Sequence, residues 1–173
     1  MLAEELGGDK SPRSIINNFQ RRRLFSNINA IKECSERMLC CLEDRLKESI
    51  VLTGICDILC EFFDKHFDPY VKYCSNQVYQ ERQLSQLKLN NPQFVNVLRR
   101  IESNKECHGL DMRSFLVLPA QRITRYRLLV YAILNRLTVD LKSHQYNIAT
   151  RAYTLASQAC LLESTEIEMG ENI

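Results

Sequence analysis

The stretch LVLPAQRITRYRLLVYAIL, residues 116–134, decides which class of fold the chain can adopt. After Pro119, apolar residues recur at spacings of three and four, at Ile123, Tyr126 and Val130. This period is typical of an α-helix that buries one face. Arginines lie between the apolar positions, so we expect the opposite face to lie in solvent.

The helical period continues on both sides of this stretch. Only 5 Gly and 4 Pro interrupt 173 residues, and long segments without helix breakers favour helices over short strands. One helical pattern starts at Leu24 and includes Leu39 and Leu46 in its apolar stripe. Asn91-Pro92 is a strong helix start, because Asn can cap and Pro suits the first turn. Later helices are expected to be capped by Thr53 and Ser143. We therefore predict an all-α bundle of long helices.

Composition excludes several classes of protein. Hydrophobic residues make up 45% and charged residues 25%, as in ordinary globular domains. Lys and Arg number 23 against 21 Asp and Glu, and this balance gives no support for nucleic-acid binding. No apolar run approaches the ~20 residues that span a bilayer, and the N-terminus does not resemble a signal peptide. We expect a cytoplasmic protein.

The eight cysteines are interpreted as reduced thiols that are buried as small apolar residues. They include no CxxC pair, and no secretory signal points to disulfides. A metal or redox site is the alternative that the pattern leaves open. The three histidines are scattered, and no glycine-rich phosphate loop or zinc-protease motif occurs. We predict no cofactor, no metal and no side-chain catalysis by the chain itself.

Two surfaces are candidates for binding. The first is the run Arg21, Arg22 and Arg23, either a solvated helix start or a contact with phosphoinositide or an acidic partner. Basic residues at a helix start oppose the macrodipole, which favours a functional reason for the run. The second surface is a stripe of Gln121, Arg125 and Leu128, spaced four and three apart. It is either a mixed docking strip or a simple exposed face.

Residues 116–134 resemble the third conserved region of Dbl-homology (DH) domains, the exchange-factor domains of Rho-family GTPases. Residues 24–46 and 66–84 resemble the second conserved region and the central helices of that family. The resemblance is strongest to the ephexin-like branch, which often has Leu, Leu118 in this chain, where many relatives have Lys. The positions that match the third region are Leu116, Pro119, Gln121, Arg122, Arg125, Tyr126, Leu128 and Leu129.

The resemblance implies an elongated bundle of about six long helices and a guanine-nucleotide exchange factor that needs no cofactor. Such a domain remodels the switch segments of a Rho, Rac or Cdc-type GTPase and releases GDP, in signalling to the actin cytoskeleton. It implies GTPase contacts for Gln121, Arg125, Leu128, Leu118 and Ser164. It implies structural roles for Pro119, Arg122 and Tyr126.

The resemblance also implies departures from the complete domain. The family's first conserved region carries a Glu that contacts the first switch, and this Glu lies upstream of residues 24–46. LAEEL, residues 2–6, resembles the end of that first helix, so Glu4 and Glu5 do not take the role. We expect a partial DH domain over residues 1–163 with a truncated first helix, a frayed acidic tail over 164–173 and no pleckstrin-homology domain.

Three functions are compatible with these patterns. The first is a weakened exchange factor. The second is a non-catalytic helical module, or decoy, that binds a GTPase without exchange. The third is a module on an anionic membrane surface that uses Arg21, Arg22 and Arg23, and it would recruit the chain to the membrane periphery.

Overall fold

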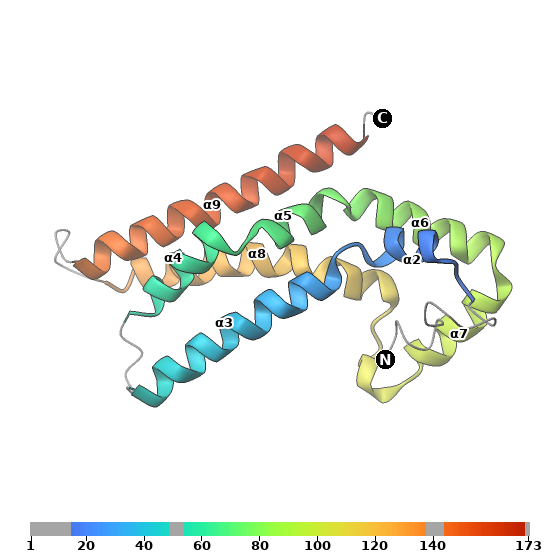
Figure 1. The fold of residues 1–173 in the computed structure, drawn as a ribbon, viewed down its shortest axis with the longest axis horizontal. Helices are drawn as coiled ribbons and strands as arrows, with labels where there is room; N and C mark the ends of the chain where they lie inside the picture. The colour runs from blue at the N-terminus through green and yellow to red at the C-terminus, as the bar shows by residue number, and fades with distance from the viewer. Residues whose placement is uncertain (1–14, 49–53, 138–143, 172–173) are drawn as a thin grey trace. The chain divides into compact units, whose positions relative to one another are not determined.

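The computed structural model describes residues 15–48, 54–137 and 144–171, and all the regular structure in these ranges is helical. Eight α-helices, α2 to α9, and one short 3₁₀-helix lie in this described part, which confirms the all-α prediction (Figure 1). The helices belong to two compact units. One unit ends at Ser26 and resumes over Asn76–Leu118, and the other contains Asn27–Ser75 and the chain from Pro119 onward.

The first unit contains α2 (Asn18–Phe25), α6 (Gln77–Asn90), α7 (Pro92–Glu102), the 3₁₀-helix Lys105–Cys107 and the start of α8 (Met112–Leu134). Helix α6 packs against α2 and against α7. The core of this unit consists of apolar side chains that are almost fully removed from solvent: Ile16, Leu24, Leu84, Leu87, Phe94, Leu98, Met112 and Leu116.

The prediction of one continuous helix from Leu24 is wrong, because α2 ends at Phe25 and α3 (Ile28–Glu48) follows. Between them, Ser26 has φ 47° and ψ −128°, a conformation that no helix can contain. Arg22 and Arg23 therefore lie in the last turn of α2 and not at a helix start. Cations at a helix C-terminus are favourable, so the expected conflict with the macrodipole does not exist.

The second unit contains α3, α4 (Ile55–Lys65), α5 (Asp68–Ser75), most of α8 and α9 (His144–Glu171). Figure 1 shows α9 alongside α4 and α5, and α4 is its most extensive helix contact. Helix α9 approaches with four buried alanines, Ala149, Ala152, Ala156 and Ala159. Small side chains let two helix backbones come close together.

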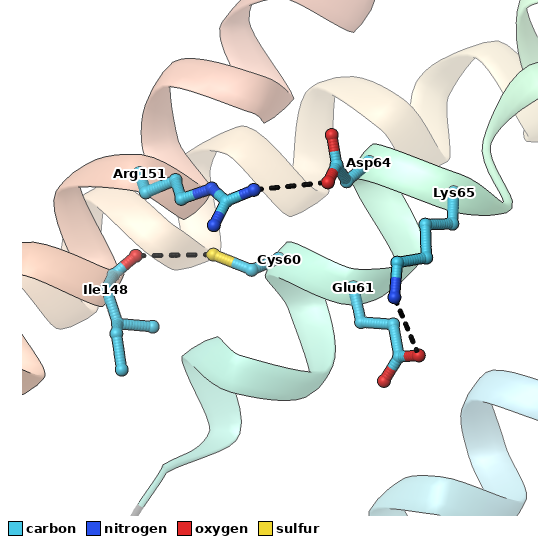
Figure 2. A network of polar contacts seen from close by, with 6 residues as sticks. All are labelled: Cys60, Glu61, Asp64, Lys65, Ile148 and Arg151. Atoms are coloured by element: carbon cyan, nitrogen blue, oxygen red, sulfur yellow. Dashed lines mark hydrogen bonds and ion pairs between the residues drawn. The ribbon is translucent and has the colours of Figure 1, made fainter.

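Polar contacts fix α9 against α4 beside this alanine stripe (Figure 2). Arg151 donates to Asp64 at 3.1 Å, and the Cys60 thiol donates to the carbonyl of Ile148 at 3.4 Å. The Arg151–Asp64 pair is exposed, so it contributes little to stability by itself. These contacts specify which residues of the two helices lie opposite each other.

The predicted apolar stripe of α3 is correct in part. Ile31 is buried and Ile28 and Leu42 pack against the same core, but Leu39 and Leu46, which we also expected to be buried, are 53% and 51% exposed. Cys34 and Met38 enter the core as well. The presence of leucine alone does not decide which side of the helix packs.

Pro119 and Pro69 also lie within helices. Pro119 lies within α8, where its ring supplies no N–H for the carbonyl four residues earlier, so the helix continues past a missing hydrogen bond. Pro69 lies in the first turn of α5, a position that tolerates proline. A break at Asn76 separates α5 from α6.

Some predictions lie outside the described residues, namely those for Glu4, Glu5, Thr53 and Ser143. The N-cap of α4 is Gly54, with φ 79°. This left-handed conformation favours glycine, because a side chain there would be strained. Helix α9 extends to Glu171, across residues 164–171 of the predicted frayed tail.

Asn91 connects two parts of the first unit, and its replacement provides a test of the predicted helix start. Its Oδ1 accepts from the backbone N–H of Phe94 at 3.0 Å, and its Nδ2 donates to the carbonyl of Ile15 at 2.8 Å. We expect Asn91→Ala to lower the free energy of unfolding by about 1–2 kcal/mol, measured by urea denaturation. Asn90→Ala, at the neighbouring exposed position, is the control and should change stability by less than about 0.5 kcal/mol. Equal effects would contradict a capping role.

Candidate functional site

The buried face of α8 holds this helix in the second unit. Ile123 and Val130 are 1% and 0% exposed, and both belong to the core cluster that α4 and α5 share. The ring of Tyr126 meets the edges of two further aromatic rings, with centroids 5.8 Å from Phe63 and 5.9 Å from Phe67. These aromatic contacts fix the rotation of α8 about its axis, and so they determine which residues face solvent.

Arg122 is held on the same helix by Tyr126. Its Nε donates to the phenolic oxygen at 2.6 Å, and its guanidinium lies 5.4 Å from the centroid of the ring. The two side chains are four residues apart, so they meet on adjacent turns. The contact keeps Arg122 beside the core side of α8.

The opposite face of α8 carries the predicted stripe. Gln121, Arg125 and Leu128 are all exposed, and 55% of Leu128 is accessible to solvent. Spacings of four and three along a helix place the three side chains on one side. An apolar side chain this exposed beside an amide and a guanidinium is suited to a mixed protein interface.

The helix that carries this stripe is basic from Pro119 onward. From Pro119 to Leu134, α8 carries Arg122, Arg125 and Arg127 and no Asp or Glu. The guanidinium of Arg125 offers donors in a fixed planar arrangement that matches a carboxylate. The face can therefore bind an acidic surface, but it contains no nucleophile or general base.

The other predicted site residues lie in different surroundings. Leu118 is 40% exposed at the end of the first unit, whereas Gln121, Arg125 and Leu128 belong to the second. Pro119 is buried, as a structural residue would be. Ser164 belongs to α9, and its side chain lies outside the described part of the structure.

The structure adds two residues to the candidate face that the sequence interpretation missed. Thr124 and Tyr131 are exposed and lie on the Leu128 side of the stripe. The ring of Tyr131 lies 5.8 Å from that of Tyr153 on α9, and 49% of the residue remains accessible. Their spacing of four and three from Leu128 is the signal that could have identified them.

The cysteines are not all buried, which corrects the sequence interpretation. Cys34, Cys56, Cys74 and Cys107 are buried and Cys60 and Cys160 are half-buried, but Cys40 and Cys41 are exposed on α3. All eight lie in the described ranges, and none of them forms a disulfide there. Burial raises the pKa of the Cys34 and Cys60 thiols, and it raises the pKa of Cys56 to about 11. Buried thiols of this kind are poor nucleophiles.

Thiol labelling at pH 7.5 should therefore separate these groups. We expect iodoacetamide to modify Cys40 and Cys41 first in the folded chain, as read by peptide mass spectrometry. The raised pKa alone makes thiolate at Cys56 about a hundredfold scarcer than for an ordinary thiol, and burial adds further protection. In urea all eight should react. Early labelling of Cys56 without denaturant would contradict this packing.

The described residues show neither a metal site nor a membrane span. No three side chains of His, Cys, Asp or Glu gather there as metal ligands would. Within the same ranges, every helix is too short or too polar to cross a bilayer.

Comparison with known proteins assigns the family. The RhoGEF domain matches residues 4–159, and the chain therefore belongs to the RhoGEF domain family. It is 40% identical over 158 residues to human Rho guanine nucleotide exchange factor 16, covering 91% of this chain and 22% of that protein. Over 124 residues it is 43% identical to human Ephexin-1, covering 72% of this chain and 18% of that protein. The predicted relationship to the ephexins is confirmed.

Solved structures confirm the fold. The chain superimposes with a TM-score of 0.83 on one chain of the crystal structure of human RhoA in complex with the DH/PH fragment of PDZRHOGEF. The two chains are 18% identical, and the match covers 98% of this chain and 50% of the other. It superimposes with a TM-score of 0.72 on the DH domain of FARP2, at 21% identity, covering 91% and 76%. The chain spans about a fifth of the length of the two curated relatives.

Proposed function

We propose that the chain binds a Rho-family GTPase through the α8 stripe of Gln121, Arg125 and Leu128 and promotes release of GDP. The observation that carries this proposal is the exposure of these three side chains on one acid-free helix face in a RhoGEF family member. A relative of the same fold has been crystallised with RhoA, which supports a GTPase of this class as the partner.

The mechanism that we infer is differential affinity. A surface that binds the nucleotide-free GTPase more tightly than the loaded form lowers the barrier to nucleotide release. The switch segments of small GTPases are ordered by phosphate and Mg²⁺ contacts, so a partner that remodels them loosens the nucleotide. Arg125 would supply the charge-assisted contact, and Leu128 the apolar contact beside it. The chain needs no catalytic side chain for this reaction.

We further propose that these 173 residues alone exchange nucleotide weakly. The acidic contact that the resemblance assigns to the first conserved region has no counterpart in this sequence. One charge-assisted hydrogen bond is worth on the order of 1.5–3 kcal/mol. If that contact operates fully in the transition state, its loss slows exchange by roughly ten- to hundredfold.

A cytoplasmic location and a contact of Arg21, Arg22 and Arg23 with anionic lipid complete the proposal. Both are consistent with a domain that acts on a GTPase, and neither is required for exchange in solution. The support for the lipid contact lies in the charge of the run, which anionic head groups would attract.

Release of fluorescent GDP from purified Rho, Rac and Cdc-type GTPases tests the proposal. We expect acceleration with at least one of them, and direct binding to the nucleotide-free form of the same GTPase. Binding without acceleration would indicate the alternative, a non-catalytic module or decoy. If a folded, helical chain neither binds nor accelerates any of the panel, the proposal is wrong.

A further inference from the structure

Helix α2 exposes an aromatic ring beside two of its arginines. Phe19 is 66% exposed, an unusual state for a phenylalanine, and Arg22 and Arg23 are exposed one turn further along the helix. Arg21, the first residue of the run, is half-buried. The basic run is therefore not uniform, and its accessible part is the pair Arg22 and Arg23.

Arg23 lies between rings from two helices. Its guanidinium carbon is 5.4 Å from the ring centroid of Phe19 on α2 and 5.7 Å from that of Tyr79 on α6. Cation–π contacts of this kind hold a guanidinium in place without neutralising its charge. No ion pair to Arg22 or Arg23 occurs among the described residues. The charge of Arg23 is held in position by the two rings, and both charges remain available to an anion.

These side chains surround a hollow of about 460 Å³ within the first unit. It is lined by Phe19, Arg22, Arg23, Ser26, Asn76 and Tyr79, and none of these is acidic. On one side, Nδ2 of Asn76 donates to Oγ of Ser26 at 3.1 Å. Ser26 has a positive φ, and non-glycine residues in such conformations cluster at functional sites.

The charge of the unit is consistent with an anionic partner. The described residues of the first unit include nine Lys and Arg and four Asp and Glu, a net charge of +5. The described residues of the second unit include eleven Lys and Arg and thirteen Asp and Glu, a net charge of −2. The near-neutral charge of the whole chain conceals this difference. A local positive field steers the first unit towards negative surfaces.

We propose that this surface, defined by Phe19, Arg22, Arg23 and Tyr79 and called the α2 patch, binds an anionic lipid bilayer. A lipid phosphate occupies the hollow between Arg22 and Arg23, and Phe19 enters the boundary between head groups and acyl chains. An acidic peptide would satisfy the arginines, but it would leave Phe19 in water. An exposed ring beside fixed cations is instead typical of interfacial membrane contacts. This proposal rests on the lipid contact proposed above, restricts it to Arg22 and Arg23, and does not depend on GTPase exchange.

Sedimentation with vesicles of phosphatidylcholine, with and without phosphatidylserine, tests the proposal on the whole chain. We expect binding only to the anionic vesicles. Each arginine near such a surface contributes about fivefold to partitioning, so Arg22→Gln with Arg23→Gln should lower it by about 30-fold. The matched control is Arg99→Gln with Arg100→Gln. That pair makes the same charge change, is exposed and lies in the last turn of α7 in the same unit.

Variants of Phe19 distinguish binding to a membrane from binding to other anions. We expect Phe19→Ala to lower vesicle partitioning by roughly tenfold and Phe19→Trp to retain it. Inorganic phosphate at millimolar concentration should not displace the chain, whereas displacement would identify a phosphate site without a membrane role. Binding to polyglutamate but not to vesicles would overturn the lipid assignment in favour of an acidic partner.

Other outcomes also decide the question. Equal losses for the Arg22/Arg23 and Arg99/Arg100 pairs would reduce the proposal to a net-charge effect and overturn the α2 patch. No binding to anionic vesicles would overturn it directly. Nucleotide release in lipid-free solution is measured in parallel, so failure of exchange and failure of membrane binding are distinguishable.

Discussion

Replacing Arg125 with Glu is expected to lower the affinity of the chain for the proposed GTPase partner by about 100-fold and to remove any acceleration of GDP release. The variant loses a charge-assisted hydrogen bond, worth on the order of 1.5–3 kcal/mol, and places a like charge against an acidic partner. The side chain is exposed on α8, so the folded state should tolerate the change. Affinity is measured by titration of the nucleotide-free GTPase.

Arg37→Glu is the matched control for this variant. Arg37 is also an exposed arginine within a helix of the second unit, but it lies on α3. We expect its reversal to change affinity by less than about threefold, because Arg37 lies outside the α8 stripe and single exposed charges contribute little. Equal losses for both variants would indicate long-range attraction only. An unchanged affinity for Arg125→Glu would remove the α8 stripe from the interface.

Phe94→Ala is expected to be strongly destabilising, with a loss of about 3–5 kcal/mol in the free energy of unfolding. Phe94 is 0% exposed and is the largest apolar side chain of the first unit's core. Truncation to Ala leaves a cavity among leucines and Met112 that cannot collapse fully. The loss is a large fraction of the stability of an ordinary domain.

Phe19→Ala makes the same chemical change in the same unit at a residue that is 66% exposed. We expect it to alter stability by less than about 0.5 kcal/mol. The free energy of unfolding of both variants is measured by urea denaturation, with far-ultraviolet circular dichroism as the signal. Similar losses for the two variants would mean that Phe19 is packed in solution, which would also contradict its place in the α2 patch.

Local signals in the sequence were sufficient to predict several elements. Asn91-Pro92 predicted the start of α7, because both the cap and the proline act within one turn. The period of α8 predicted that Ile123 is buried and that Gln121, Arg125 and Leu128 are not. To predict such a stripe, it is enough to know that the segment is helical and which side of it is buried. The pattern of residues 116–134 indicates both.

Features set by tertiary packing could not be predicted in the same way. The break at Ser26 depends on a conformation held by a side chain 50 positions away, Asn76. Leu39 and Leu46 follow a helical period as well as Met38 does, and only the position of the neighbouring helices decides which face is buried. The ring contact between Tyr131 and Tyr153 joins two helices that the sequence does not place together.

The alanine stripe of α9 has a consequence for the thermodynamics of packing in the second unit. A buried alanine has no side-chain torsion to restrict, so α9 makes its contacts at these four positions without loss of rotamer entropy from its own side chains. The small size of these side chains also makes the packing sensitive to substitution. At Ala149, Ala152 and Ala156 the exposed fraction is 1% or less, so a larger side chain there has to displace packed neighbours. Substitution at these positions is therefore expected to disturb the packing of α9.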